Sequence, residues 1–317
     1  EEERFLRNKH AYRVYPRRAL RYCLEAAGIG PAEVAAIGVN WNLDAYGDGR
    51  IAAFFDSMAE DWPLDPATKG WQRAMLGGFN RTAYEARHAR EWRRSFGDIP
   101  LPRIVGLPHH FTHALQSYLQ SPFDNAVCVT IDGSGDEHCT VVWRCRGDSI
   151  EAMREIRMPH SLGWFYAAFT EYLGFEAYDG EYKVMGLAAY GRPDAALSTK
   201  VAEVLHPAPD GIEYRLAPHY IHYGPRSWSD RFTDHLPELL GRPPRSSDAP
   251  LDDWHQDLAF AVQAALEGAV EPLVTWALKE AGTGNLCIGG GVGLNVKMNS
   301  RLQALPAVER FFAHPLC

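Results

Sequence analysis

Two histidines four residues apart are the first candidates for chemistry in this sequence. His109 and His113 follow an apolar run at residues 103–107, and a helix is expected over residues 113–119. On a helical turn, side chains at i and i+4 share a face, so the two imidazoles could bind one metal ion. His110 occupies the position of the glutamate in an HExxH zinc-protease motif, so the general base of that motif is absent. Surface or core histidines with ordinary hydrogen bonds would show the same spacing.

An aspartate and a glycine turn follow the next expected strand, at residues 126–131. Asp132 stands at the end of that strand, where its carboxylate could enter a cleft and bind a metal. The glycines of the turn would let a phosphate approach backbone N–H groups. Residues 140–143 look like the returning arm of a hairpin, and Asp and Gly favour hairpin turns for local reasons alone. A ligand site and a plain turn both remain open for Gly133, Ser134 and Gly135.

A second glycine run follows an expected strand at residues 285–288. Gly290 and Gly291 belong to the loop that connects this strand to a helix. Glycines in such a loop permit close approach of a ligand, and a helix N-terminus favours anionic groups. Asn295 and Asn299 would fall on one face of the helix. A tight strand-to-helix turn would use the same glycines without any ligand.

Glu181 and Lys183 form a third candidate pair, within the segment GEYKVMGLAAYG at residues 180–191. They flank a single residue, so in an extended segment both side chains would project to the same side. The pair could line a ligand site, or it could form a simple ion pair on the surface.

The elements that must position these residues alternate between strands and helices. Strand, helix and strand are expected in turn over residues 103–131, which is the alternation of an α/β fold. Residues 254–280 predict one long amphipathic helix, bent at Pro272. The other expected features are a helix at residues 16–27, a strand at residues 34–39, helices within residues 41–100 and a long irregular surface insertion at residues 207–250.

Composition excludes several classes of protein. The chain has 317 residues, 46% of them hydrophobic, which is enough for one large domain or two lobes. A net charge of -8 argues against a nucleic-acid partner. No apolar run reaches the roughly 20 residues that span a bilayer, and the acidic first residues do not resemble a signal peptide. We therefore expect a soluble, cytoplasmic protein without a membrane partner. Six scattered cysteines indicate neither a zinc ribbon nor a disulfide framework.

Five segments, in order along the chain, resemble the motifs of the NodU/CmcH family of O-carbamoyltransferases. Asp136 stands where the family usually has glutamate, and Ala189 replaces a proline. The family motifs are EERFxRxKH, HHxxHA, a strand ending in DGxGE, GExKVMGLAPYG and GGVALNxxxN. The corresponding segments here are residues 2–10, 109–114, 129–136, 180–191 and 290–299.

The resemblance implies an α/β fold of the two-lobed actin-like ATPase and sugar-kinase type, related to the tRNA threonylcarbamoyl-transfer enzymes. The lobes would cover roughly residues 1–125 and 126–317. It further implies that His109, His113 and Asp132 bind iron(II). The residues placed near carbamoyl-adenylate are Lys9, Gly133, Ser134, Gly135, Gly290, Gly291, Asn295 and Asn299, with Glu181 and Lys183 nearer the acceptor and His110 as a possible base.

The implied reaction is transfer of a carbamoyl group from carbamoyl-adenylate to a hydroxyl of an antibiotic or saccharide-like acceptor. A YrdC-like domain, normally on the same chain, makes that donor from ATP and carbamoyl phosphate, and no stretch here resembles it. The family pattern extends beyond both ends of this sequence, so we expect a transfer domain that is truncated at each end and could form a homodimer. The alternatives are a kinase or phosphohydrolase of the same fold and a non-catalytic nucleotide-binding module.

Overall fold

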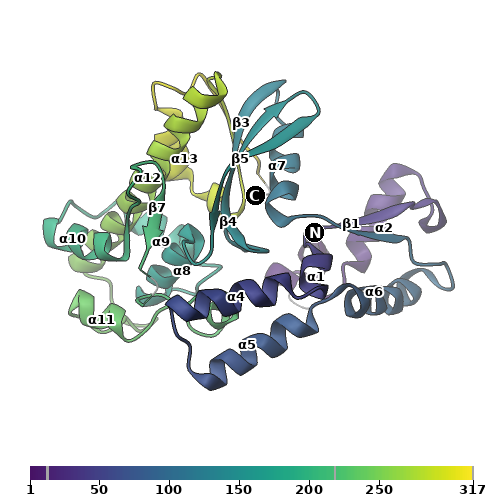
Figure 1. Cartoon of the computed structure of the whole chain (residues 1–317), viewed down its shortest axis with the longest axis horizontal. Coiled ribbons are helices and arrows are strands. Elements are labelled where there is room, and N and C mark those ends of the chain that lie inside the picture. Colours follow the sequence, from purple (N-terminus) through teal and green to yellow (C-terminus); the bar gives the residue numbers. More distant parts are fainter. Residues whose placement is uncertain (12–13, 218, 316–317) are drawn as a thin grey trace. The chain divides into compact units, whose positions relative to one another are not determined.

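The computed structural model describes residues 1–11, 14–217 and 219–315, which divide into two units (Figure 1). The first unit comprises Glu1–Ala52 and Ala74–Leu107, and the second comprises Ala53–Arg73 and Pro108–Cys317. The lobe boundary expected near residue 125 stays a prediction.

The first unit contains a pair of parallel strands and several helices. The strands are β1 (Ala36–Val39) and β2 (Arg103–Gly106), in the register Ala36 to Arg103. Its small core contains Val39, Leu43 and Ile104. Both strands and the expected helix α2 are confirmed. The helices are α1 (Glu2–Leu6), α2 (Arg17–Ala27), α3 (Leu43–Gly47) and α6 (Arg81–Phe96), while α4 (Arg50–Asp61) and α5 (Pro66–Gly78) cross the division between the units.

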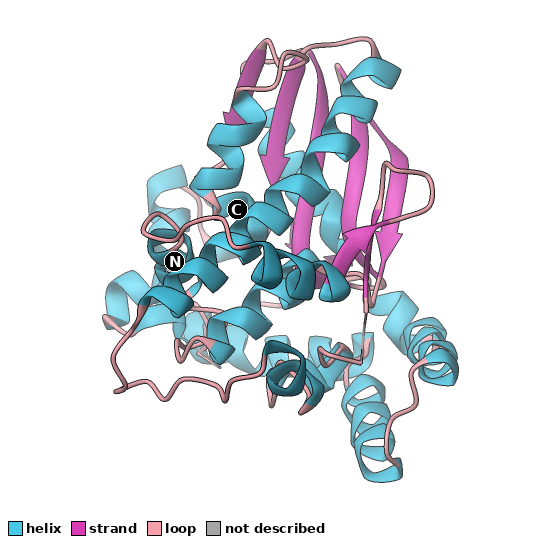
Figure 2. Ribbon diagram, turned by 90° about the vertical axis from the view of Figure 1, so that its left-hand side faces the viewer, coloured by secondary structure: helices cyan, strands magenta, loops and turns pink. Residues whose placement is uncertain are grey.

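A five-stranded mixed sheet is the centre of the second unit (Figure 2). Its order is β5-β4-β3-β8-β9, with antiparallel pairing from β3 to β5 and parallel pairing of β3, β8 and β9. The central strand β3 is buried along most of its length because helices cover both faces. The strands are β3 (Asn125–Gly135), β4 (His138–Arg146), β5 (Ser149–Arg157), β8 (Asn285–Gly289) and β9 (Arg310–Ala313). The hairpin and the strand at residues 285–288 are thus confirmed.

The helix α7 (His109–Leu119) packs on one face of the sheet, and α8 and α12 contact β3 from the other side (Figure 1). The core beneath α7 includes Ala114, Tyr118, Cys128 and Cys287. The other helices of this unit are α8 (Leu162–Tyr172), α9 (Glu181–Leu187), α10 (Ala195–Val204), α11 (His235–Leu240), α12 (Asp253–Ala281) and α13 (Val296–Gln303).

The long helix α12 matches the expected one within a residue at each end and contains Pro272. The side chain of Asp252 accepts a hydrogen bond from the backbone of His255 at its start, and Gly282 ends it in a left-handed conformation. Among the described residues, α12 alone is long and apolar enough to cross a membrane. Half of its most apolar window is buried in the unit, as in the core helix of a globular domain.

The segment at residues 207–250 is more ordered than the sequence predicts. It contains β7 (Tyr214–Leu216), which pairs with β6 (Leu205–Pro207), a short helical turn at Gly224–Trp228 and the helix α11. Leu236 and Leu240 of α11 are buried. The expectation of a wholly irregular surface insertion is wrong, because apolar residues spaced among the prolines form part of the core.

Candidate metal centre

The first turn of α7 is fixed against the turn between β3 and β4. Pro108 precedes the helix, and the backbone N–H of His109 donates to Asp136 Oδ2 at 2.9 Å. Asp136 is buried and has a φ of 58°, a conformation that aspartate adopts more readily than most residues. The helix therefore begins at His109, four residues earlier than the sequence predicts, and the end of β3 lies beside it.

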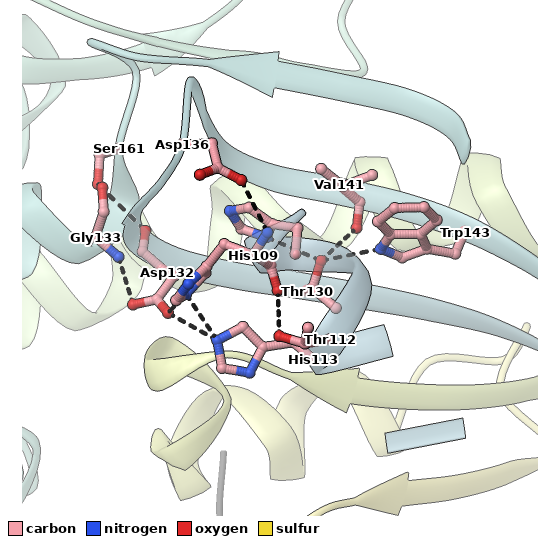
Figure 3. A network of polar contacts seen from close by, with 11 residues as sticks. His109, Thr112, His113, Thr130, Asp132, Gly133, Asp136, Val141, Trp143 and Ser161 are labelled. Carbon is pink, nitrogen blue, oxygen red and sulfur yellow. Dashed lines mark hydrogen bonds and ion pairs between the residues drawn. The ribbon is translucent and has the colours of Figure 1, made fainter. Parts of the chain in front are cut away.

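His109, His113 and Asp132 converge at this point (Figure 3). His109 Nε2 lies 3.2 Å and His113 Nε2 lies 3.0 Å from Asp132 Oδ2, and the two imidazole nitrogens are 3.1 Å apart. Ligand atoms about 2.1 Å from a single ion have separations near 3 Å when the angles at the ion are roughly 90°. The three side chains thus fit one first-row metal ion in the arrangement of two histidines and one carboxylate.

The carboxylate of Asp132 is held in its charged form. Burial raises its pKa, but hydrogen bonds from His109 and His113 outweigh burial, and the pKa of Asp132 is held below its usual range. Its other oxygen, Oδ1, accepts the N–H of Gly133 at 2.7 Å, which leaves Oδ2 facing the imidazoles. An ionised oxygen that faces two imidazoles is prepared to bind a cation.

The glycine segment after Asp132 makes room for the histidine ligand. It is the end of β3 and not the turn that the sequence predicts, because the turn falls at residues 136–137. A Cβ on Gly135 would lie 2.4 Å from His109 Cδ2, far closer than a side chain can approach. Gly133 and Gly135 belong to β3, and Ser134 lies between them. Packing of the His109 ring is thus a sufficient reason for glycine at residue 135, and the predicted phosphate contact of residues 133–135 stays a prediction.

His110 does not share the contact that His109 and His113 make with Asp132. Its side chain lies in the core instead. Its side chain is 3% exposed, and Nδ1 lies 3.0 Å from Thr130 Oγ1, which also accepts a hydrogen bond from Trp143 Nε1. Its Nε2 is buried without a partner among the described residues. Burial lowers the pKa of His110 to about 3, so the ring is neutral at physiological pH.

The second glycine run lies against the same strand end. Gly290 has a φ of 83°, and a Cβ there would lie 2.3 Å from the carbonyl oxygen of Ile131. A Cβ on Gly291 would lie 3.1 Å from Asp132 Oδ1. The loop therefore brings its backbone next to the carboxylate of the candidate metal centre.

The two asparagines of this segment bond mainly to the protein itself. Asn295 caps α13, where its Oδ1 accepts the N–H of Met298 at 2.9 Å. Asn299 Nδ2 donates to the carbonyl of Gly293 at 2.7 Å, while Asn299 Oδ1 is buried without a partner among the described residues. The unpaired oxygen of Asn299 is free to accept a hydrogen bond from a ligand or a water.

Glu181 and Lys183 do not lie in an extended segment, so that expectation is wrong. They belong to the first turn of α9, where residues two apart point to different sides of the helix. Glu181 Oε1 accepts the N–H of Tyr178 at 2.7 Å, and burial raises the pKa of Glu181. Lys183 Nζ lies 5.8 Å from the ring centre of Phe175. No described contact joins either side chain to the metal triad.

Lys9 lies in a short helical turn, Lys9–Ala11, of the first unit, whereas the triad belongs to the second. Its role at the nucleotide stays a prediction.

Two polar residues that stabilise the site by hydrogen bonds are not among those predicted from the sequence. Ser161 caps α8, and its Oγ donates to the carbonyl of Gly133 at 2.6 Å and accepts the N–H of Trp164 at 3.0 Å. Serine directly before an apolar helix is a capping signal that could have identified it. Gln263 is 3% exposed within the apolar face of α12, and its amide forms hydrogen bonds with Asn295, Tyr166 and Glu267. A lone glutamine in an apolar helical stretch is the only signal that the sequence gives for it.

Comparison with known proteins identifies the family. A family model described as "Carbamoyltransferase N-terminus" matches residues 1–317. The chain belongs to this family. Family membership is consistent with the mixed α/β architecture, and it agrees with the resemblance drawn from the five sequence motifs.

Three relatives illustrate the range of similar proteins. An uncharacterized protein of Synechocystis sp. is 33% identical over 308 residues, 95% of this chain and 48% of its own length. The nodulation protein NolNO of Sinorhizobium fredii is 28% identical over 317 residues, 99% of this chain and 41% of its own length. A tRNA N6-adenosine threonylcarbamoyltransferase of Bordetella petrii is 30% identical over 229 residues, 71% of this chain and 58% of its own length. The chain thus spans less than half the length of the first two relatives.

Proposed function

We propose that this chain is the transfer domain of an O-carbamoyltransferase that moves a carbamoyl group from carbamoyl-adenylate to a hydroxyl of a small-molecule acceptor. The observation that carries the proposal is the convergence of His109, His113 and Asp132 beside a glycine loop, in a chain of the carbamoyltransferase N-terminal family. An antibiotic or saccharide-like acceptor is part of the proposal.

Iron(II) is the proposed ion, because two imidazoles and one carboxylate are the ligand set typical of non-haem iron(II) sites. His109, His113 and Asp132 would hold it. Bound there, the ion would polarise the carbamoyl oxygen and stabilise the negative charge that develops during acyl transfer. The depressed pKa of Asp132 keeps a negative charge at the site throughout the neutral range.

In the proposed reaction the acceptor hydroxyl oxygen attacks the carbamoyl carbon. A carbon–oxygen bond forms to the acceptor, the bond from that carbon to the adenylate phosphate oxygen breaks, and AMP leaves. The hydroxyl proton must pass to a base. The neutral ring of His110 is chemically able to accept it, but its Nε2 is buried, so His110 can act only if the site opens or a water reaches it.

The nucleotide would lie along the two glycine segments. The loop backbone at Gly291 lies close to Asp132, since a Cβ there would be 3.1 Å from Asp132 Oδ1, and Asn299 Oδ1 offers one unused hydrogen-bond acceptor. Glu181 and Lys183 would bind the acceptor. The full set proposed for carbamoyl-adenylate is Lys9, Gly133, Ser134, Gly135, Gly290, Gly291, Asn295 and Asn299.

We further propose that the complete protein has a two-lobed actin-like fold and works in the cytoplasm. Similarity to a tRNA N6-adenosine threonylcarbamoyltransferase supports the fold relation. A YrdC-like domain would make carbamoyl-adenylate from ATP and carbamoyl phosphate, which is compatible with relatives about twice as long as this chain.

The test separates activation from transfer. In one assay the chain receives ATP, carbamoyl phosphate and a panel of alcohols and sugars, and in the other it receives preformed carbamoyl-adenylate with the same panel. We expect a carbamoylated product by mass spectrometry only in the second assay. A carbamoylated product in the first assay would place the activation chemistry in this chain. Phosphorylated products in the first assay would instead support a kinase, and binding without any product would support a non-catalytic module.

A further inference from the structure

The helix α7 carries a second pair of polar side chains on the face that carries the two histidines of the metal triad. Its residues turn by about 100° each, so positions 109, 113, 116 and 120 all fall within roughly 60° of one another around the axis. Gln116 and Gln120 therefore continue the stripe that begins with His109 and His113. Gln120 caps the end of the helix and is exposed.

Both glutamines form hydrogen bonds with one buried histidine. His314 directly follows β9 and is 5% exposed. Its Nε2 lies 2.8 Å from Gln120 Oε1, and its Nδ1 lies 3.3 Å from Gln116 Nε2. Two side chains of the same helix thus contact the two ring nitrogens of His314.

The chemistry of these contacts fixes their direction. A carbonyl oxygen such as Gln120 Oε1 can only accept, so Nε2 of His314 carries a proton and donates it. In the neutral ring Nδ1 then has a lone pair, which accepts a hydrogen bond from the amide group of Gln116. One neutral imidazole therefore satisfies both contacts at once.

His314 is anchored to the sheet that carries the third residue of the triad. β9 pairs with β8 in the register Ala313 to Ile288, and the backbone N–H of His314 lies 3.5 Å from the carbonyl oxygen of Ile288. β8 in turn pairs with β3, the strand that contains Asp132. The two glutamines thus connect α7 to the sheet in which the aspartate is fixed.

A small rotation of α7 about its axis would displace the metal ligands. Side-chain atoms lie about 5 to 6 Å from the axis of a helix, so a rotation of about 10° moves them by about 1 Å. Apolar packing of Ala114 and Tyr118 holds α7 on the core, but apolar contacts are not directional. Directional contacts hold both ends of the helix, at the backbone N–H of His109 on Asp136 and at His314.

We propose that Gln116 and Gln120 are positioning residues, which bind His314 and thereby fix the rotation of α7 at which both imidazoles of the triad face the aspartate. This inference rests on the proposed function, since it assumes that the triad binds a metal ion. Both glutamines act through the histidine ligands and touch neither the ion nor the substrate.

The test measures the binding of cobalt(II) to the whole chain by visible absorption. Gln120→Met keeps the length of the side chain but removes the acceptor for His314, and we expect about tenfold weaker cobalt affinity, at the lower end of the effect of residues that orient metal ligands. The spectrum of the bound cobalt(II) should change as well, because it depends on the geometry of the ligands. A loss of stability alone would leave the spectrum of the bound ion unchanged.

Two matched variants separate this hydrogen bond from other effects. Gln120→Glu keeps an acceptor oxygen for His314 and should have the affinity and the spectrum of the parent chain. Its added charge lies about 10 Å along the helix from His113, beyond the Debye length of about 8 Å at physiological salt, so its direct effect on the ion is screened. Gln303→Met changes another exposed glutamine, at the end of α13, and should bind cobalt(II) as the parent does. Thermal unfolding of each variant checks that it is folded.

The outcomes distinguish this inference from the function on which it rests. If the parent chain does not bind cobalt(II), the proposed metal site fails and this inference with it. If the parent binds the ion but folded Gln120→Met shows the same affinity or an unchanged spectrum, the positioning role is refuted while the proposed function stands. An equal loss of affinity in Gln120→Glu or in Gln303→Met would also refute it, because neither variant removes the acceptor for His314.

Discussion

Replacing His113 by alanine removes one of the three atoms that converge at the candidate metal centre. The change deletes the contacts of His113 Nε2 with Asp132 Oδ2 at 3.0 Å and with His109 Nε2 at 3.1 Å. His109 and Asp132 remain in contact at 3.2 Å, so two ligands are retained. A two-ligand site is expected to hold a divalent ion much more weakly than the intact triad.

The size of the loss follows from the arrangement. Loss of a residue that merely orients a metal ligand typically weakens metal affinity by 10- to 100-fold, so loss of a ligand itself should cost at least about 100-fold. That factor corresponds to about 2.7 kcal/mol of binding free energy. The effect on folding should be smaller, about 1 kcal/mol, because His113 is partly exposed and its hydrogen bonds are few.

Anaerobic titration with iron(II), with cobalt(II) as a spectroscopic substitute, would measure this loss. His255→Ala is a suitable control, because His255 is also a partly buried histidine beside an aspartate, Asp252, but it only caps α12. His255→Ala should keep the affinity of the parent chain. Equal iron affinity in His113→Ala and the parent would refute the metal site.

Three further predictions concern Gly135, His160 and Asn299. Gly135→Ala should destabilise the fold by about 2 kcal/mol and weaken metal binding, because the methyl group would collide with His109. Urea unfolding and metal titration measure the two effects, and unchanged stability together with unchanged metal affinity would contradict the packing. Burial lowers the pKa of His160 to about 4, whereas a histidine in an unfolded chain has a pKa of about 6.5. As the pH decreases, the imidazole of the unfolded chain is therefore protonated before that of the folded chain, and the free energy of unfolding should fall. Between pH 7 and 5 the loss should be about 2 kcal/mol by urea unfolding, and a His160→Gln variant that keeps the same slope would contradict this assignment. Asn299→Ala should weaken AMP binding by about tenfold in calorimetry, and unchanged AMP affinity would leave its buried oxygen without a ligand role.

The sequence predicts local structure well where the pattern is local. The helix α12 is apolar at helical spacing, has a cap at Asp252 and a glycine stop at Gly282, so its bounds follow from its own residues. The hairpin of β3 and β4 likewise follows from two apolar strands separated by glycines, although its turn falls at residues 136–137 and not at the predicted residues 132–135.

Features that depend on distant partners were harder to predict. The start of α7 at His109 depends on Asp136, 27 residues away, which accepts its backbone N–H. Glycine at residue 135 is explained by the ring of His109, and Gln263 by Asn295, 32 residues away. The helical placement of Glu181 was missed because a seven-residue helix gives only a weak periodic signal.

The sequence pattern alone predicts only part of the metal triad. The spacing of His109 and His113 predicts a shared face, but pairing them with Asp132 required the family resemblance, because no local pattern joins a helix to a neighbouring strand end. The structure brings all three ligand atoms within 4.8 Å of one another.

The most direct test of the central claim is a single-turnover assay with preformed carbamoyl-adenylate and anaerobically added iron(II), in which the carbamoylated acceptor is quantified by mass spectrometry. The parent chain and the His255→Ala control should give product, and His113→Ala and Asp132→Asn should give at least about 100-fold less, since both alter the proposed ligand set. Product formation at the parent rate in folded His113→Ala and Asp132→Asn would contradict the assignment of this site to carbamoyl transfer.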